Sequence, residues 1–93
     1  MSNRTAIITG AARRLGAAIA ADLHRIGMDV IIHYHYSYAE AQALVQRLNT
    51  LRPGSAHAIT ADLAGTGSCQ DLIDQACAIN HRLDVLVNNA AVF

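Results

Sequence analysis

Two glycines six positions apart, Gly10 and Gly16, mark the segment of this sequence best suited to binding chemistry. Residues 9–16 lie between an apolar run and a helical pattern, so backbone N–H groups and the positive end of a helix could receive a pyrophosphate there. Arg13 and Arg14 add two guanidinium groups, which match pairs of phosphate oxygens. The glycines alone also fit a tight strand-to-helix turn, and the arginines alone fit a solvated helix start.

The next strand pattern ends in a stretch without carboxylates, which reads His33, Tyr34, His35, Tyr36 and Ser37. In dinucleotide sites this position distinguishes a ribose hydroxyl from a 2′-phosphate. Ser37 would open a helix whose N-terminal amides favour an anion, although it could also be a plain helix cap. The stretch therefore favours NADP(H) over NAD(H). His33 and His35 also have the spacing of a metal pair, but no third ligand is apparent and we assign no metal site.

Two further strand ends carry polar residues. Asp62 and Leu63 follow the third strand pattern, where a carboxylate could accept a hydrogen bond from an adenine amino group. An ordinary loop or helix-cap aspartate is the alternative. Asn88, Asn89 and Ala90 follow the fourth pattern, where asparagine amides could bridge neighbouring strands and a small residue would let a ribose approach. A plain turn is the alternative there.

Short β-branched runs alternate with longer helical patterns along the whole chain, in the order βαβαβαβ. We expect strands at residues 4–9, 29–35, 56–60 and 83–87. The run Val30, Ile31 and Ile32 lacks polar alternation, as in a strand covered on both faces. Right-handed crossovers then predict an α/β fold, a parallel sheet with helices on both faces.

Three helices are predicted between these strands from the spacing of apolar residues. The first should bury Leu15, Ile19, Leu23 and Ile26. The second begins with the capping-box pair Ser37 and Glu40 and ends before Pro53. Its expected buried face is Ala41, Leu44, Val45, Leu48 and Leu51. The third begins at Ser68 and should bury Leu72, Ile73, Ala76 and Cys77.

Composition excludes several classes of protein. Hydrophobic residues make up 53% of the 93 residues and charged residues 15%, which suits a buried core and excludes disorder as the main state. The formal net charge is zero, so nothing points to nucleic acid or to an anionic membrane as a partner. The longest apolar stretch, residues 15–21, is too short to span a bilayer. With no signal-peptide pattern at the N-terminus, we expect a cytoplasmic location.

Three ordered motifs resemble the N-terminal half of a short-chain dehydrogenase/reductase: Thr9-Gly10 with Arg14 and Gly16, then Ala61-Asp62-Leu63, then Asn88-Asn89-Ala90. Arg14 stands where most of that superfamily has its middle glycine. This substitution resembles the pteridine reductase branch, as do His33-Tyr34-His35 with Ser37, and Asn89-Ala90 with Phe93. The resemblance implies a partial NAD(P)-binding Rossmann fold with strand order 3-2-1-4. The first two helices would cover one face and the third the other. Residues 1–93 would be the N-terminal part of a single domain.

The resemblance also implies roles for individual residues. The implied NADP(H)-binding set is Gly10, Arg14, Leu15, Gly16, His35, Tyr36, Ser37, Asp62, Leu63, Asn89 and Ala90. Asp62 and Leu63 would hold the adenine, and Asn89 and Ala90 would approach the ribose. Arg14 and Phe93 would reach a pterin-like small-molecule substrate, with Phe93 stacked on the pterin. A core or terminal aromatic is the alternative for Phe93. A homo-oligomer, a tetramer, is implied for the parent protein.

Two positions depart from the branch pattern. Tyr36 replaces the arginine that usually follows this histidine, which weakens the expected affinity for a 2′-phosphate. Ala91 replaces a serine, which removes a possible hydroxyl contact to the substrate.

The superfamily's proton donor is a tyrosine four residues before a lysine, and this chain contains no lysine. We therefore expect no catalytic residue in these 93 residues and no reductase activity from the chain alone. The chain ends in the loop after a strand that should be central to a larger sheet. This indicates a truncated cofactor half of an NADP-dependent reductase. A segment of a 3-oxoacyl carrier-protein reductase, or a complete non-catalytic nucleotide-binding module, is the alternative.

Overall fold

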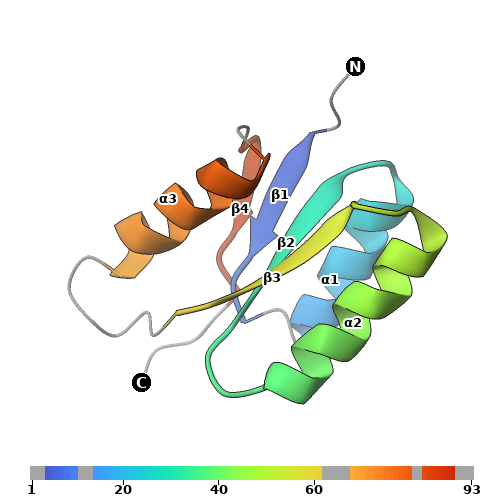
Figure 1. Ribbon diagram of the computed structural model, residues 1–93, viewed down its shortest axis with the longest axis horizontal. Coiled ribbons are helices and arrows are strands. Elements are labelled where there is room, and N and C mark those ends of the chain that lie inside the picture. Colours follow the sequence, from blue (N-terminus) through green and yellow to red (C-terminus); the bar gives the residue numbers. More distant parts are fainter. Residues whose placement is uncertain (1–3, 11–13, 62–67, 81–82, 90–93) are drawn as a thin grey trace.

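A computed structural model of the chain describes residues 4–10, 14–61, 68–80 and 83–89. Within these residues a parallel sheet of four strands packs with three helices (Figure 1). In chain order the elements are β1 (Thr5–Ile8), α1 (Arg14–Arg25), β2 (Asp29–Tyr34), α2 (Tyr38–Leu51), β3 (Ala56–Thr60), α3 (Ser68–Asn80) and β4 (Val85–Val87). The spatial order β3-β2-β1-β4 confirms the predicted α/β topology.

The two central strands consist of residues that can be buried on both faces. Ile7 pairs with Ile31 and Ile8 with Ile32 in the β1–β2 register, and all four side chains are fully buried. Because successive side chains in a strand point to opposite faces, each strand contributes to two cores.

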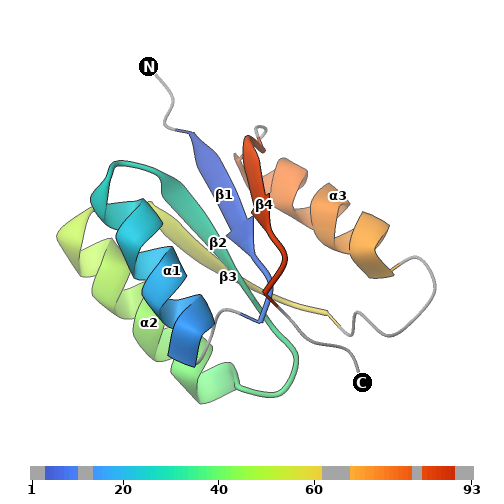
Figure 2. The same cartoon turned by 180° about the vertical axis from the view of Figure 1, so that it is seen from behind.

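Each face of the sheet carries its own core. The cluster between the sheet and the helices α1 and α2 includes Ile8, Ala20, Val30, Ile32, Leu44 and Leu48. The cluster on the α3 face consists of Ile7, Ile31, Ile59, Leu72 and Ala76, with Leu83 packed against it. Figure 2 shows α1 and α2 on one side of the sheet and α3 on the other, which confirms the predicted placement.

Three apolar residues predicted to be buried are exposed instead. Leu15 and Ile26 are 66% and 72% exposed, and Leu51 at the end of α2 is exposed as well. Helix α1 buries a line of mostly small residues, Gly16, Ala20 and His24. A helix that approaches the sheet through small residues turns its larger neighbours outwards, which accounts for Leu15. Ile26 and Leu51 lie at or beyond the last helical residue, where the buried stripe ends.

The fourth strand is shorter than the predicted range 83–87 because polar contacts replace the regular ladder at its start. The backbone N–H of Thr5 donates to Oδ2 of Asp84 at 2.9 Å, and the backbone N–H of Asp84 donates to the Thr5 carbonyl at 2.9 Å. The strand then pairs with β1 only over Val85–Val87.

A buried polar cluster closes the edge of the sheet where the strands begin. The Asn49 amide oxygen accepts from the backbone N–H groups of Ser55 and Ala56, both at 2.9 Å. The Ser55 hydroxyl lies 2.6 Å from Nε2 of His24 and donates to the Arg52 carbonyl. Because its one proton is used there, Ser55 accepts from His24, so this serine–histidine pair is structural and not nucleophilic.

No helix in the described part of the chain has the length and apolar character needed to cross a membrane.

Candidate functional site

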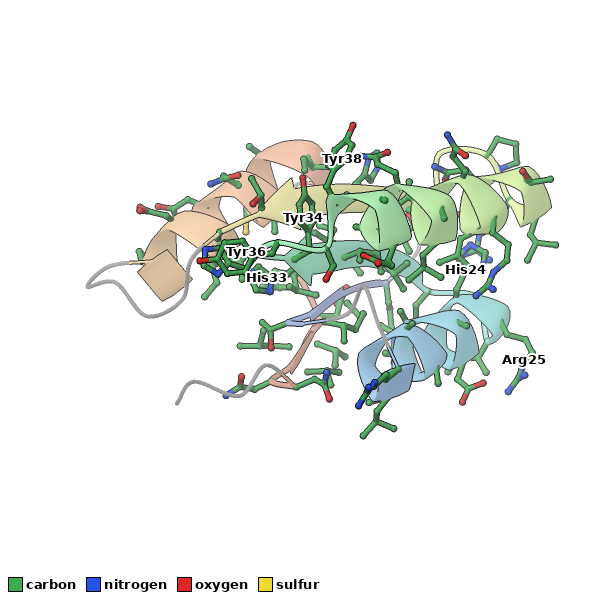
Figure 3. All side chains as sticks on the ribbon, turned by 90° about the horizontal axis from the view of Figure 1, so that it is seen from below. His24, Arg25, His33, Tyr34, Tyr36 and Tyr38 are labelled. Atoms are coloured by element: carbon green, nitrogen blue, oxygen red, sulfur yellow. The ribbon has the colours of Figure 1, made fainter. Side chains whose placement is uncertain are left out.

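All four strands end at the same edge of the sheet, because they run parallel. Gly10 follows β1, Ser37 follows β2, Ala61 follows β3 and Asn89 follows β4. Ligands of open parallel sheets bind outside this carboxyl edge. In Figure 3 His33, Tyr34, Tyr36 and Tyr38 all lie to the left of His24 and Arg25, which are on the right of the view. The structure thus brings the described motif residues to one edge.

Both backbone polar groups of Gly10 are hydrogen-bonded. Its backbone N–H donates to Nδ1 of His33 at 2.9 Å, and its carbonyl accepts from the Asn89 side-chain amide at 3.2 Å. Its φ of 61° lies in the left-handed region, which glycine adopts without a steric penalty. The tight turn into the loop therefore needs glycine at this position.

His33 has a role that the sequence analysis missed. The side chain is only 3% exposed, and Nε2 lies 2.7 Å from the Ala61 carbonyl while Nδ1 accepts from Gly10. Burial lowers the pKa of His33 below its ordinary value of 6.5, although the Ala61 hydrogen bond raises it, and His35 lowers it further. Both ring nitrogens are occupied by backbone partners, so His33 does not fit the metal-pair interpretation.

A threonine and an asparagine connect the ends of β1 and β4. The Thr9 hydroxyl accepts from the Asn89 backbone N–H at 2.9 Å and lies 3.3 Å from both the Val87 carbonyl and the Asn88 side-chain oxygen. With the Asn89 amide on Gly10, these contacts bridge the two strands, as expected from asparagine amides at a strand end. They fix Asn89 beside the start of the glycine loop.

Arg14 begins α1 with an unusual backbone. Its φ is 53°, in the left-handed region, and its side chain is exposed. For a residue other than glycine this conformation costs about 1–2 kcal/mol. Gly16, two residues later, is buried and lets the helix lie against the sheet, while Leu15 projects outwards.

The end of β2 presents aromatic rings at the same edge. The rings of His35 and Tyr36 lie 3.8 Å apart at an angle of 31°, and Tyr36 is 86% exposed. Tyr34 and Tyr38 meet edge to face with their centroids 5.9 Å apart. The exposed rings of His35 and Tyr36 therefore stack on each other beside the start of α2.

The predicted capping box at Ser37 is wrong. Ser37 is the N-cap residue of α2, but its side chain makes no cap hydrogen bond. Its φ of −85° and ψ of 57° depart from the extended backbone that aims an N-cap side chain at the first turn. The hydroxyl is therefore not used as a helix cap, although its residue stands at the helix N-terminus.

Several predicted site residues lie outside the described residues, namely Arg13, Asp62, Leu63, Ala90, Ala91 and Phe93. Among the described residues, no group of three histidine, cysteine or acidic side chains is arranged to hold a metal ion.

Comparison with known proteins shows which family the chain belongs to. The short chain dehydrogenase family matches residues 4–93. The chain belongs to this family. Pteridine reductase 1 of Leishmania tarentolae is 42% identical over 106 aligned positions, which cover 95% of this chain and 36% of the relative. A 3-oxoacyl-[acyl-carrier-protein] reductase of Synechocystis is 35% identical over 92 positions, covering 99% of this chain and 37% of that protein.

A third relative is matched over most of its own length. The Bacillus subtilis homologue YusS is 32% identical over 90 positions, covering 97% of this chain and 82% of YusS. This chain spans only 36% and 37% of the first two relatives above. Membership in the short chain dehydrogenase family implies a nicotinamide dinucleotide as the cofactor.

The described residues fit a bound dinucleotide. A left-handed glycine, a helix start with an exposed guanidinium, and a buried second glycine form the edge that a pyrophosphate needs. A bound dinucleotide would be held and oriented by these residues, and it would supply the redox chemistry.

Proposed function

We propose that this chain is the NADP(H)-binding part of a reductase whose substrate is a pterin or dihydropteridine. In this proposal residues 1–93 are the N-terminal part of a single dinucleotide-binding domain. The homo-oligomer and the cytoplasmic location expected above stay predictions.

The backbone of Arg14 is the observation that carries the proposal. A glycine would adopt the φ of 53° found at Arg14 without steric cost, whereas for arginine this conformation costs about 1–2 kcal/mol. Strain of this kind is retained at functional positions. The exposed guanidinium stands at the start of α1, where it can bind the pyrophosphate and face the substrate. Among the relatives, 42% identity with a pteridine reductase supports the same substrate class.

The end of β2 supports NADP(H) over NAD(H). Ser37 stands at the N-terminus of α2 with its hydroxyl outside any cap bond, so the hydroxyl can contact a 2′-phosphate. His35 supplies a further polar group two residues earlier, and no carboxylate lies between them to repel the phosphate. Tyr36, in place of arginine, offers an aromatic face but no charge.

The remaining roles are assigned by the resemblance to the family. Asp62 and Leu63 would hold the adenine, and Asn89 and Ala90 would approach the ribose. Of these, Asn89 is fixed by its bonds to Thr9 and Gly10. Phe93 would stack on the pterin ring. No residue of this chain is assigned a catalytic role.

Cofactor preference gives the first test. We expect the protein to bind NADPH more tightly than NADH in a fluorescence titration. Ser37→Ala should weaken NADPH binding at least about tenfold, the value of one hydrogen bond to a charged group. The same variant should leave NADH binding unchanged, because NADH has no 2′-phosphate. Equal affinities in the unmodified protein, or tighter NADH binding, would contradict the preference.

Substrate preference gives the second test. A complete reductase that contains this segment should turn over dihydrobiopterin or dihydrofolate and not an acetoacetyl thioester. Arg14→Gly relieves the backbone strain but removes the guanidinium, so we expect pterin turnover to fall at least about tenfold while folding is retained. Turnover of the thioester alone would transfer the protein to the 3-oxoacyl carrier-protein reductases, which the Synechocystis relative represents.

A further inference from the structure

A buried histidine links the residues that follow β1 and β3, and the proposed chemistry does not use it. His33 is the fifth residue of β2 and is nearly inaccessible to solvent. It contacts Gly10, at the start of the glycine loop, and Ala61, which directly precedes Asp62. One side chain thus joins Gly10, after β1, to Ala61, after β3.

The partners determine the protonation state of the ring. A backbone N–H can only donate, so Nδ1 of His33 must accept from Gly10 and cannot carry a proton. A carbonyl can only accept, so Nε2 must carry the proton that it donates to Ala61. The ring is therefore neutral, with its proton on Nε2.

The chain of contacts crosses the whole sheet. Ala61 after β3 bonds to His33, His33 bonds to Gly10 after β1, and Gly10 bonds to Asn89 after β4. Together with the hydrogen bond from the Asn89 backbone N–H to the Thr9 hydroxyl, this chain of hydrogen bonds fixes the separation of the strand ends at the proposed cofactor edge.

We propose that His33 is a positioning residue that holds Gly10, after β1, and Ala61, after β3, at the spacing required for NADP(H). This role rests on the proposed function, because it assumes that the chain binds NADP(H). The two contacts of His33 are observed in the structure. Protonation of Nδ1 would turn the acceptor for Gly10 into a second donor and break that bond. Cofactor affinity should therefore decrease in acid.

The surroundings of the ring set the pH range of this effect. From β1 and β3 it meets the backbone of Gly10 and Ala61, and the titratable side chain that acts on it among the described residues is His35. With the pKa of His33 lowered by burial, the contact is complete above pH 6.5 and is lost as the pH falls through the lowered value.

Two isosteric variants separate the two contacts. In His33→Asn the amide oxygen can replace Nδ1 and keep the hydrogen bond from the Gly10 N–H. In His33→Gln the amide nitrogen can replace Nε2 and keep only the hydrogen bond to the Ala61 carbonyl. We expect His33→Gln to weaken NADPH binding about tenfold and His33→Asn about threefold at neutral pH. Neither variant should show the decrease in acid that the unmodified protein shows. His57→Gln, on β3, is the matched control and should change neither property.

Nuclear magnetic resonance of the ligand-free protein tests the contact separately from the function. We expect the ¹⁵N shifts of His33 to report a neutral ring protonated at Nε2, and the Gly10 amide to shift and exchange faster as His33 titrates. If both variants fold and bind NADPH within twofold of the unmodified protein, the positioning role is wrong. If the spectra agree but neither NADPH nor NADH binds, the proposed function fails and the contact stands. A ring protonated at Nδ1 refutes the contact itself.

Discussion

Replacing Ile31 with alanine is expected to lower the free energy of unfolding by about 3 kcal/mol, within the range for isoleucine-to-alanine changes in cores. Ile31 lies in the middle of β2, paired with Ile7 on one side and His57 on the other. It is fully buried against Ile59 and Leu72 under α3. Truncation removes buried methyl groups and leaves a cavity between two strands and a helix, which the regular sheet cannot close.

Ile26→Ala is the matched control, because it makes the same chemical change at a site that is 72% exposed. It should alter stability by no more than about 0.5 kcal/mol. Urea denaturation followed by circular dichroism measures both variants, and an unchanged m-value ensures that the midpoints can be compared. Similar losses for the two variants would refute the assignment of Ile31 to the core and of Ile26 to the surface.

This pair of isoleucines shows which part of the fold follows from sequence. The unbroken run Val30, Ile31 and Ile32 is long enough to predict a strand covered on both faces, and the structure confirms it. Ile26 matched the helical period equally well but lies just beyond the end of α1. Periodicity assigns the face of an element reliably only inside that element, so errors concentrate at its ends.

The candidate site shows the same division between local and tertiary information. Parallel topology alone brings the residues after each strand to one edge, so its location could be predicted. The partners of His33 could not, because they depend on how far Gly10 and Ala61 extend past their strands. One signal was available: a histidine that continues a buried strand must find hydrogen-bond partners. Arginine itself gives no sign of the left-handed backbone at position 14, and the available signal was that most of the superfamily has a glycine there.

The largest effect concerns catalysis. A protein consisting of these 93 residues is expected to oxidise NADPH with dihydrobiopterin at least about 100-fold more slowly than a complete pteridine reductase, the lower bound for loss of a positioned acid. The family's donor is a tyrosine paired with a lysine, and the chain has no lysine. Its three tyrosines all lie at the end of β2 and the start of α2, beside His35 and Ser37. There they face the proposed adenosine end of the site and not the nicotinamide.

The measurement must separate binding from chemistry. NADPH binding is followed by fluorescence and its oxidation by absorbance, with pteridine reductase 1 of Leishmania tarentolae as the positive control for turnover. We expect the 93-residue chain to retain weak binding, because Gly10, Arg14 and the end of β2 are all present, and to show no turnover above background. Tyr36→Phe should leave both results unchanged, because that hydroxyl has no part in proton transfer. Turnover that disappears in Tyr36→Phe would show that the chain carries its own proton donor, and the division between a binding segment and a catalytic remainder would be wrong.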